Sequence, residues 1–167
     1  MKHIYLIGFM GCGKSTVSSY LSKNCGYQLI EMDEQIEKEQ KMSISEIFAK
    51  NGEEYFRGLE TALIRNLNGI SDKTVVSCGG GVPMRQENVE AMRKNGKIIW
   101  LDVSPETVYE RVRYSQNRPL LEGNMNVEYI TGLLEKRIPK YRAAADEIIR
   151  VDGKKPEEIA EEILCIS

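Results

Sequence analysis

The chain has 167 residues, of which 41% are hydrophobic and 29% are charged, a composition that fits one soluble domain with a buried core. Its 23 lysines and arginines against 25 aspartates and glutamates leave a net charge of −2. That balance argues against general binding of nucleic acid, because such affinity comes mostly from net positive charge. No apolar stretch approaches the ~20 residues needed to span a bilayer. We therefore expect a cytoplasmic protein that binds neither nucleic acid nor membrane.

The cysteines show no metal-binding or disulfide pattern. Cys12, Cys25, Cys78 and Cys165 form no C-x-x-C pair, and the chain contains one histidine. A zinc site is therefore not expected, and the four thiols are typical of a reduced cytosolic protein.

Short apolar runs alternate with amphipathic stretches along the whole chain. The expected strands are residues 3–7, 28–32, 74–78, 97–103 and 147–151. Helical patterns lie between them, and helix-start signals occur at Ser43 with Glu46, at Ser104-Pro105 and at Pro156. This alternation predicts an α/β fold with a parallel sheet and helices on both faces. The polar stretch 114–126 predicts a mobile excursion from that fold.

The segment after the first expected strand carries the strongest motif. Residues 8–15, GFMGCGKS, match G-x-x-x-x-G-K-[ST] between a strand and a helix. Glycines let backbone N–H groups approach phosphate oxygens, Lys14 can reach the β- and γ-phosphates, and Ser15 can ligate Mg²⁺. The motif predicts binding of a nucleoside triphosphate. Cys12 inside the loop is interpreted as a small residue filling a tight turn, with a redox switch as the alternative.

Two further segments end on residues suited to chemistry. Glu31 and Asp33 alternate at the end of the second expected strand, where acids can hold metal or orient a hydroxyl. The alternative is that Asp33 caps the following helix. The run Gly79-Gly80-Gly81 follows the third strand, and three glycines favour a close approach of backbone to a ligand over a plain turn.

The arginines are ambiguous when each is taken alone. Arg57 and Glu60 lie three residues apart on a predicted helix, a spacing typical of a solvated surface pair. Arg118 lies in the polar excursion, and Arg137 precedes Tyr141 on another helix. Each arginine by itself is interpreted as a surface residue.

Taken together and in order, these segments resemble shikimate kinase over nearly the whole chain. The matching elements are 8–15, Glu31-Met32-Asp33, the string 52–57 with Glu60, the run 79–81, Asn117-Arg118-Pro119, and Arg137 with Tyr141. The resemblance implies a single domain, 1–167, with a five-stranded parallel sheet of the nucleoside-monophosphate-kinase type. It implies a substrate-binding segment at about 33–60 and a mobile lid at about 111–123.

The resemblance also implies an activity, namely ATP-dependent phosphorylation of the shikimate 3-hydroxyl, with Mg²⁺ as cofactor, in aromatic amino acid biosynthesis. A monomer is expected. Residues implied to bind ATP are Gly11, Cys12, Gly13, Lys14, Ser15, Thr16, Arg111, Arg118 and Lys154. Residues implied to bind shikimate are Asp33, Arg57, Glu60, Gly79, Gly80, Gly81 and Arg137. Lys14, Asp33 and Arg118 would be catalytic, and Ser15 and Glu31 would hold Mg²⁺, the latter through water.

Individual roles follow from the same resemblance. Arg57 and Arg137 would clamp the shikimate carboxylate, since planar guanidinium forks bind carboxylates bidentately. Asp33 would hydrogen-bond the ring hydroxyls and take the proton. Gly80 would offer its backbone N–H, and Arg118 would reach the phosphates with the lid.

One departure from the family stands out, because Glu31 replaces the aspartate often found there and adds a methylene. Two other functions compete with the kinase interpretation. One is a gluconate or nucleoside-monophosphate kinase of the same fold. The other is a nucleotide-dependent switch, which the absence of an acidic switch motif after the third strand argues against.

Overall fold

Five parallel strands form the centre of the molecule. The structure is a computed structural model that describes residues 3–114 and 125–167. The strands are β1 (His3–Ile7), β2 (Gln28–Glu31), β3 (Thr74–Ser77), β4 (Gly96–Asp102) and β5 (Glu147–Arg150). Their order across the sheet is β2-β3-β1-β4-β5, and every neighbouring pair is parallel. The predicted sheet is therefore confirmed, with all five strands at the expected places.

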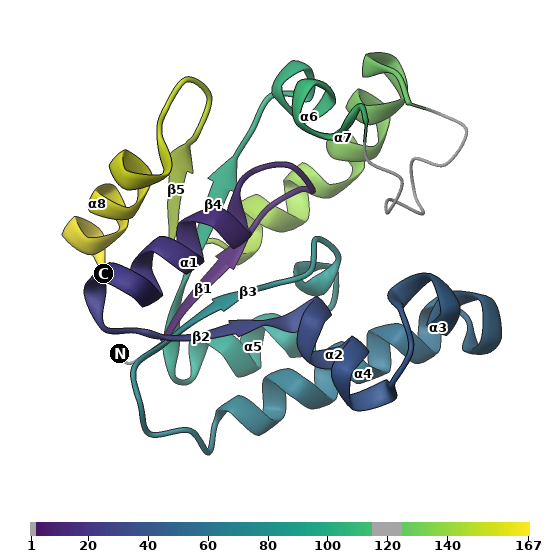
Figure 1. Ribbon diagram of the computed structural model, residues 1–167, viewed down its shortest axis with the longest axis horizontal. Helices are drawn as coiled ribbons and strands as arrows, with labels where there is room; N and C mark the ends of the chain where they lie inside the picture. Colours follow the sequence, from purple (N-terminus) through teal and green to yellow (C-terminus); the bar gives the residue numbers. More distant parts are fainter. Residues whose placement is uncertain (1–2, 115–124) are drawn as a thin grey trace.

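Helices cover both faces of the sheet (Figure 1). The first face carries α1 (Lys14–Cys25) and α8 (Pro156–Ile166), which pack on each other. The connections between β2 and β5 use α4 (Glu53–Leu67), α5 (Gln86–Arg93) and α7 (Val127–Ala144), and α4 packs on α5. The remaining helices are α2 (Met32–Gln40), α3 (Ile44–Asn51), α6 (Pro105–Val112) and the short 3₁₀ helix η1 (Val82–Met84).

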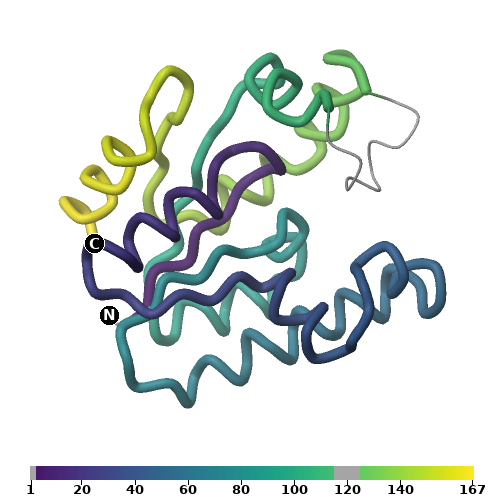
Figure 2. The backbone as a smooth tube through the Cα atoms, in the orientation of Figure 1, coloured from purple at the N-terminus to yellow at the C-terminus, as the bar shows by residue number. Residues whose placement is uncertain are grey.

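The main core lies between these layers, and a smaller one lies beside it. Central strand β1 is buried along its whole length, as the apolar run from Ile4 to Ile7 predicts for a parallel sheet covered on both faces. Ile36, Ile47 and Phe56 form a separate cluster that joins α2, α3 and α4. These helices project beyond the sheet, as the tube in Figure 2 shows. The segment predicted to bind substrate thus has a hydrophobic core of its own.

Local sequence signals fix several helix ends. Ser43 and Glu46 form the predicted capping box at the start of α3. Ser104 caps α6, where its Oγ accepts a hydrogen bond from the backbone N–H of Thr107. Within 3–114 and 125–167, no helix has both the length and the apolar character that crossing a membrane requires.

One boundary differs from the sequence prediction. β2 ends at Glu31, and α2 begins at Met32, so Asp33 lies in the first turn of a helix and not on the strand. The predicted alternation of Glu31 and Asp33 on one strand face is therefore wrong, and so is Asp33 as N-cap, because Glu31 takes that position. The strand stops early because Met32 turns into the core, where it is fully buried.

Candidate active site

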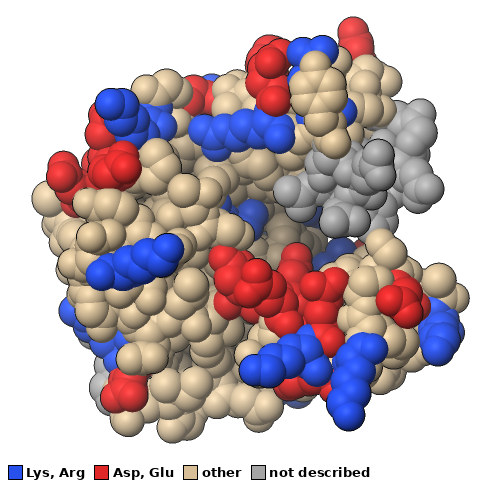
Figure 3. Space-filling model, viewed as in Figure 1, with Lys and Arg blue, Asp and Glu red and all other residues tan. Residues whose placement is uncertain are grey.

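A cavity of about 880 Å³ opens where β1, β2 and β3 end. Its walls include the 8–15 loop, the end of β2, the glycine run after β3, and residues of α4, α6, α7 and α8. The space-filling view shows this face hollowed between the projecting helices and the sheet, with basic side chains visible inside (Figure 3). The predicted residues that line it are Gly11, Cys12, Gly13, Lys14, Ser15, Thr16, Glu31, Asp33, Arg57, Glu60, Gly79, Gly80, Gly81, Arg111, Arg137 and Lys154. The fold thus brings together residues that are up to 143 positions apart by number, from Gly11 to Lys154.

The loop 8–15 has the backbone that a phosphate site needs. Gly8, Gly11 and Gly13 adopt positive φ angles of 150°, 78° and 95°, which turn the chain back toward the start of α1. The first turn of α1 contains no acidic residue, so the positive end of the helix dipole is not neutralised. Lys14 Nζ donates to the carbonyl oxygens of Gly8, at 2.7 Å, and Phe9, at 3.2 Å. The loop therefore offers backbone N–H groups, a helix N-terminus and an ammonium group at one place.

Cys12 is a structural part of this loop. Its side chain is fully buried, and its Sγ lies 2.7 Å from the position that a Cβ on Gly8 would take. The interpretation as a small residue filling a tight turn therefore agrees with the packing.

Ser15 and Glu31 lie side by side at the entrance to the loop. Ser15 Oγ donates to Glu31 Oε2 at 3.2 Å. Partial burial raises the pKa of Glu31, although hydrogen bonds from Ser15 and Ser77 oppose that rise. A hydroxyl and a carboxylate in contact fit Mg²⁺, which usually binds one or two such groups together with substrate phosphates. In the described part of the chain, no cluster of His, Cys, Asp and Glu forms an all-protein metal cage.

The glycine run after β3 is packed against charged side chains. A Cβ on Gly81 would lie 2.5 Å from Arg57 Nη1, and one on Gly80 would lie 2.8 Å from Arg137 Nη1. A Cβ on Gly79 would lie 2.5 Å from Glu60 Oε2 and 3.3 Å from Asp33 Oδ1. The groups that approach this run in the structure are the protein's own side chains, so its predicted close approach to a ligand stays a prediction. Two arginines from different helices, α4 and α7, thus meet at one loop.

Arg57 is held by two carboxylates on its own helix. Its Nη1 donates to Glu60 Oε1 at 2.8 Å, and its Nη2 donates to Glu53 Oε2 at 3.1 Å. The Arg57 side chain is 14% exposed and that of Glu60 only 1%. The interpretation of this pair as a solvated surface contact is therefore wrong. The glycine run covers Glu60, because glycines have no side chains and let α4 approach their backbone closely.

Burial dominates the electrostatics of Glu60. It raises the pKa of this carboxyl to about 7, although the neighbouring Arg57 guanidinium acts in the opposite direction. Glu60 Oε2 is buried and accepts no hydrogen bond from any residue that the structure describes. Pairing with the two carboxylates raises the pKa of Arg57 and keeps it charged. The arginine next to the cavity is thus a fixed cation.

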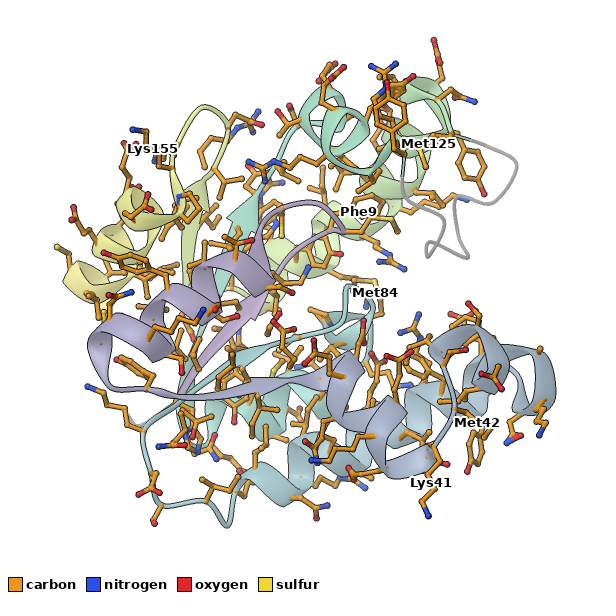
Figure 4. All side chains as sticks on the ribbon, viewed as in Figure 1. Phe9, Lys41, Met42, Met84, Met125 and Lys155 are labelled. Carbon is orange, nitrogen blue, oxygen red and sulfur yellow. The ribbon has the colours of Figure 1, made fainter. Side chains whose placement is uncertain are left out.

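The far end of the cavity is formed by α6 and α8. Arg111 Nη1 donates to the carbonyl oxygen of Gly11 at 2.8 Å, so this predicted ATP-binding residue is held against the phosphate loop. Lys154 forms an ion pair with Glu162 at 2.9 Å, and Pro156 and Ile159 line the same wall. Sequence reasoning did not assign Pro156 or Ile159 to the site, because apolar residues in the first turns of a helix carry no binding motif. Figure 4 shows Phe9 and Met84 near the loops that follow β1 and β3, the two loops that meet at this cavity.

Two predictions concern residues that the structure does not describe, or describes only in part. Arg118 is outside the described residues, and so is most of the predicted lid at about 111–123, of which the structure describes only 111–114. Their roles stay predictions.

Comparison with known proteins agrees with this site. A family model described as shikimate kinase matches residues 10–166. A shikimate kinase of Persephonella marina is 46% identical over 164 residues, which cover 98% of each chain. A shikimate kinase of Thermodesulfovibrio yellowstonii is 43% identical and is covered to 94%, against 98% of this chain.

A solved structure extends the agreement to three dimensions. Shikimate kinase from Acinetobacter baumannii, solved in complex with shikimate, superimposes with a TM-score of 0.93 at 31% identity, over 99% of this chain and 92% of that one. Its fold is the P-loop, nucleoside-monophosphate-kinase type that the resemblance implied. The match to the family model takes in most of the phosphate loop and the whole glycine run, and this chain belongs to the shikimate kinase family.

Proposed function

We propose that this chain transfers the γ-phosphoryl group of ATP to the 3-hydroxyl of shikimate, a step of aromatic amino acid biosynthesis. Membership of the shikimate kinase family supports the reaction. The observation that carries the substrate assignment is the meeting of Arg57 and Arg137 at the glycine run, inside the cavity that also holds the phosphate loop. Two guanidinium groups beside one loop suit a small carboxylate, which they can hold by charge-assisted forks.

ATP would occupy the half of the cavity between the phosphate loop and α8. The N–H groups of 11–16 and the ammonium of Lys14 would hold the β- and γ-phosphates. Arg111 and Lys154 would line the base, and Arg118 would reach the phosphates from the lid. Bound Mg²⁺, held by Ser15 and by Glu31 through water, would supply charge neutralisation on the phosphate oxygens.

Shikimate would occupy the half of the cavity between the glycine run and the segment 33–60. Arg57 and Arg137 would bind its carboxylate, and Gly80 would donate its backbone N–H. Asp33 would accept hydrogen bonds from the ring hydroxyls. The 3-hydroxyl oxygen forms the new bond to the γ-phosphorus, the bond from that phosphorus to the β–γ bridging oxygen breaks, and the hydroxyl proton passes to Asp33. ADP leaves with the electrons of the broken bond.

The protein does little covalent chemistry in this scheme. Phosphoryl transfer has a loose transition state, so positioning and charge stabilisation provide most of the rate acceleration.

We further propose that the enzyme acts as a cytoplasmic monomer and binds neither nucleic acid nor membrane.

The decisive experiment is release of ADP from ATP and Mg²⁺ with different acceptors. Shikimate, gluconate and the nucleoside monophosphates are offered separately, and the Lys14→Ala variant is the control for contaminating kinases. We expect rapid ADP release only with shikimate. Turnover with gluconate or with a monophosphate would identify another kinase of the same fold. Slow hydrolysis that no acceptor changes would identify a nucleotide-dependent switch.

The metal assignment has its own test. Ser15→Ala removes the proposed hydroxyl ligand and should raise the Mg²⁺ concentration needed for half-maximal binding of ATP, as titration calorimetry measures. An unchanged Mg²⁺ dependence would contradict the assignment.

A further inference from the structure

Tyr141 lies one helical turn after Arg137 on α7 and points its ring into the core. Its side chain is fully buried. The ring packs against Trp100, with centroids 5.8 Å apart and planes at 42°. The ring thus packs in the core, and the hydroxyl at its tip lies behind the glycine run, 3.5 Å from the position that a Cβ on Gly80 would take.

The Tyr141 hydroxyl contacts both components of the proposed carboxylate site. It donates a hydrogen bond to the carbonyl oxygen of Gly80 at 2.7 Å. The Arg137 guanidinium lies against the same hydroxyl and lowers its pKa, but burial is the larger effect and raises the pKa to about 12. The hydroxyl is thus protonated at neutral pH and remains a donor to Gly80.

The glycine run needs an anchor of this kind. Three consecutive glycines have more backbone freedom than any other sequence, and Gly79, Gly80 and Gly81 have no side chains that could hold them in place. Gly80 is also the glycine that Arg137 approaches most closely, since a Cβ there would lie 2.8 Å from its Nη1. One oxygen atom therefore links the orientation of Gly80 to that of Arg137.

We propose that Tyr141 is a positioning residue for the substrate carboxylate site: its hydroxyl fixes the Gly80 backbone and the Arg137 guanidinium relative to each other. Tyr141 does not touch the reacting atoms. Its effect is on how well two groups are arranged before the carboxylate binds, because a fork that is already aligned loses less freedom on binding. This inference rests on the proposed function, since it takes Arg137 as a ligand of shikimate.

Tyr5 provides a matched control. It is also fully buried, and its hydroxyl also makes one hydrogen bond, to Asn95 Oδ1 at 2.8 Å. Tyr5 lies on β1, and its hydroxyl contacts Asn95, which does not line the cavity, whereas the Tyr141 hydroxyl contacts Gly80, which does. Tyr141→Phe and Tyr5→Phe thus remove the same atom and one comparable hydrogen bond, one beside the site and one away from it.

The experiment compares four variants: Tyr141→Phe, Tyr5→Phe, Arg137→Ala and the double variant Arg137→Ala/Tyr141→Phe. Calorimetric titration gives the Kd of shikimate and of an ATP analogue, and thermal unfolding gives the Tm. We expect both phenylalanine variants to lower the Tm by similar amounts. Only Tyr141→Phe should raise the shikimate Kd, by about three- to tenfold, with the Kd of the ATP analogue unchanged. In the double variant the two losses should be less than additive, because Arg137→Ala already removes one of the two groups that Tyr141 positions.

Several results would overturn the proposal. A shikimate Kd for Tyr141→Phe equal to that of the wild type would do so, and so would an equal loss in Tyr5→Phe. Additive losses in the double variant would show that Tyr141 does not act through Arg137. If Arg137→Ala itself binds shikimate normally, the carboxylate assignment fails, and that outcome is distinct from failure of Tyr141 alone.

Discussion

The two glycine loops that meet at the cavity use the same residue for different physical reasons. In the phosphate loop, Gly11 and Gly13 have φ angles of 78° and 95°, a region that other residues adopt only with strain. In the loop after β3, Gly81 has an ordinary φ of −93°. There the need is for space, because a Cβ on Gly81 would lie 2.5 Å from Arg57 Nη1.

This difference separates how the two halves of the site are made. The phosphate half is built from the backbone of one continuous segment, with Lys14 as its principal side chain. The acceptor half is built from side chains on separate helices, such as Arg57 on α4 and Arg137 on α7. They lie close together because the glycine run between them has no side chains. Substitutions in the first half should therefore affect nucleotide and catalysis, whereas those in the second should affect the acceptor and the burial of charge.

The largest expected effect is in the phosphate half. Lys14→Ala removes the ammonium group proposed to stabilise charge on the transferring phosphoryl group, and kcat should fall about a thousandfold or more. Steady-state ADP release with saturating shikimate measures the loss. Near-normal turnover would show that the loop does not serve the phosphates as proposed.

The next effect is a pH dependence of stability in the acceptor half. Burial raises the pKa of Glu60 from 4.5 to about 7, so between these values the folded chain binds a proton that the unfolded chain has released. The free energy of unfolding should therefore fall as pH rises through this window, by on the order of 3 kcal/mol. Urea unfolding from pH 5 to pH 8 should show that slope in the wild type and not in Glu60→Gln.

Glu53 offers the matched control for this titration. It pairs with the same arginine, but its side chain is 58% exposed. Glu53→Gln should keep the wild-type slope, because an exposed carboxylate is not desolvated on folding. A flat profile in the wild type would mean that Glu60 stays ionised when it is buried.

The arginines test the acceptor half directly. Arg57→Ala or Arg137→Ala removes one fork from the carboxylate, and hydrogen bonds to charged groups are worth ~1.5–3 kcal/mol. Shikimate should bind about ten- to a hundredfold more weakly, while the Kd of an ATP analogue changes little. Calorimetric titration of each ligand separates these results. Loss of nucleotide binding alone would mean that the arginines serve phosphate.

The smallest expected effect tests whether the glycine run after β3 is needed to leave space for Arg57. Gly81→Ala should displace the end of Arg57 without backbone strain, and shikimate should bind about three- to tenfold more weakly. Gly132 on α7 is the control, since a Cβ there meets nothing within 4 Å, and its alanine variant should gain ~0.5–1 kcal/mol of stability. A Gly81→Ala variant that binds shikimate normally would show that the second loop does not need glycine for space.

Sequence reasoning succeeded where the signal is local. The phosphate loop occupies eight consecutive residues, and the cap at Ser104 and the capping box at Ser43 depend on neighbours three positions away. The three central strands were predictable because parallel strands buried on both faces are short, mainly apolar runs. The edge strands β2 and β5 are only partly buried, and pairs of apolar residues between helical patterns indicated them. Each of these features is decided within a few residues of the chain.

Reasoning from the residues alone failed where burial comes from a distant segment. Nothing near Arg57 and Glu60 in the sequence indicates that a loop some twenty residues later will cover them, so the pair looked solvated. Asp33 was expected at the end of a strand, but β2 ends at Glu31 and the buried Met32 begins α2, so Asp33 lies on a helix. The family resemblance assigned Asp33, Arg57 and Glu60 to the site by their place in a longer pattern, which local periodicity does not contain.

The position of β1 in the middle of the sheet has a consequence for how the protein folds. On one side Ile4 pairs with Val75, and on the other it pairs with Lys97. Such distant pairings form slowly, because a long loop must close before any contact repays its entropy. During synthesis β1 gains its second neighbour only after β4, 93 positions further along the chain from His3 to Gly96, has been made. The phosphate loop, which follows β1, therefore depends for its final shape on a strand that is made much later in the chain.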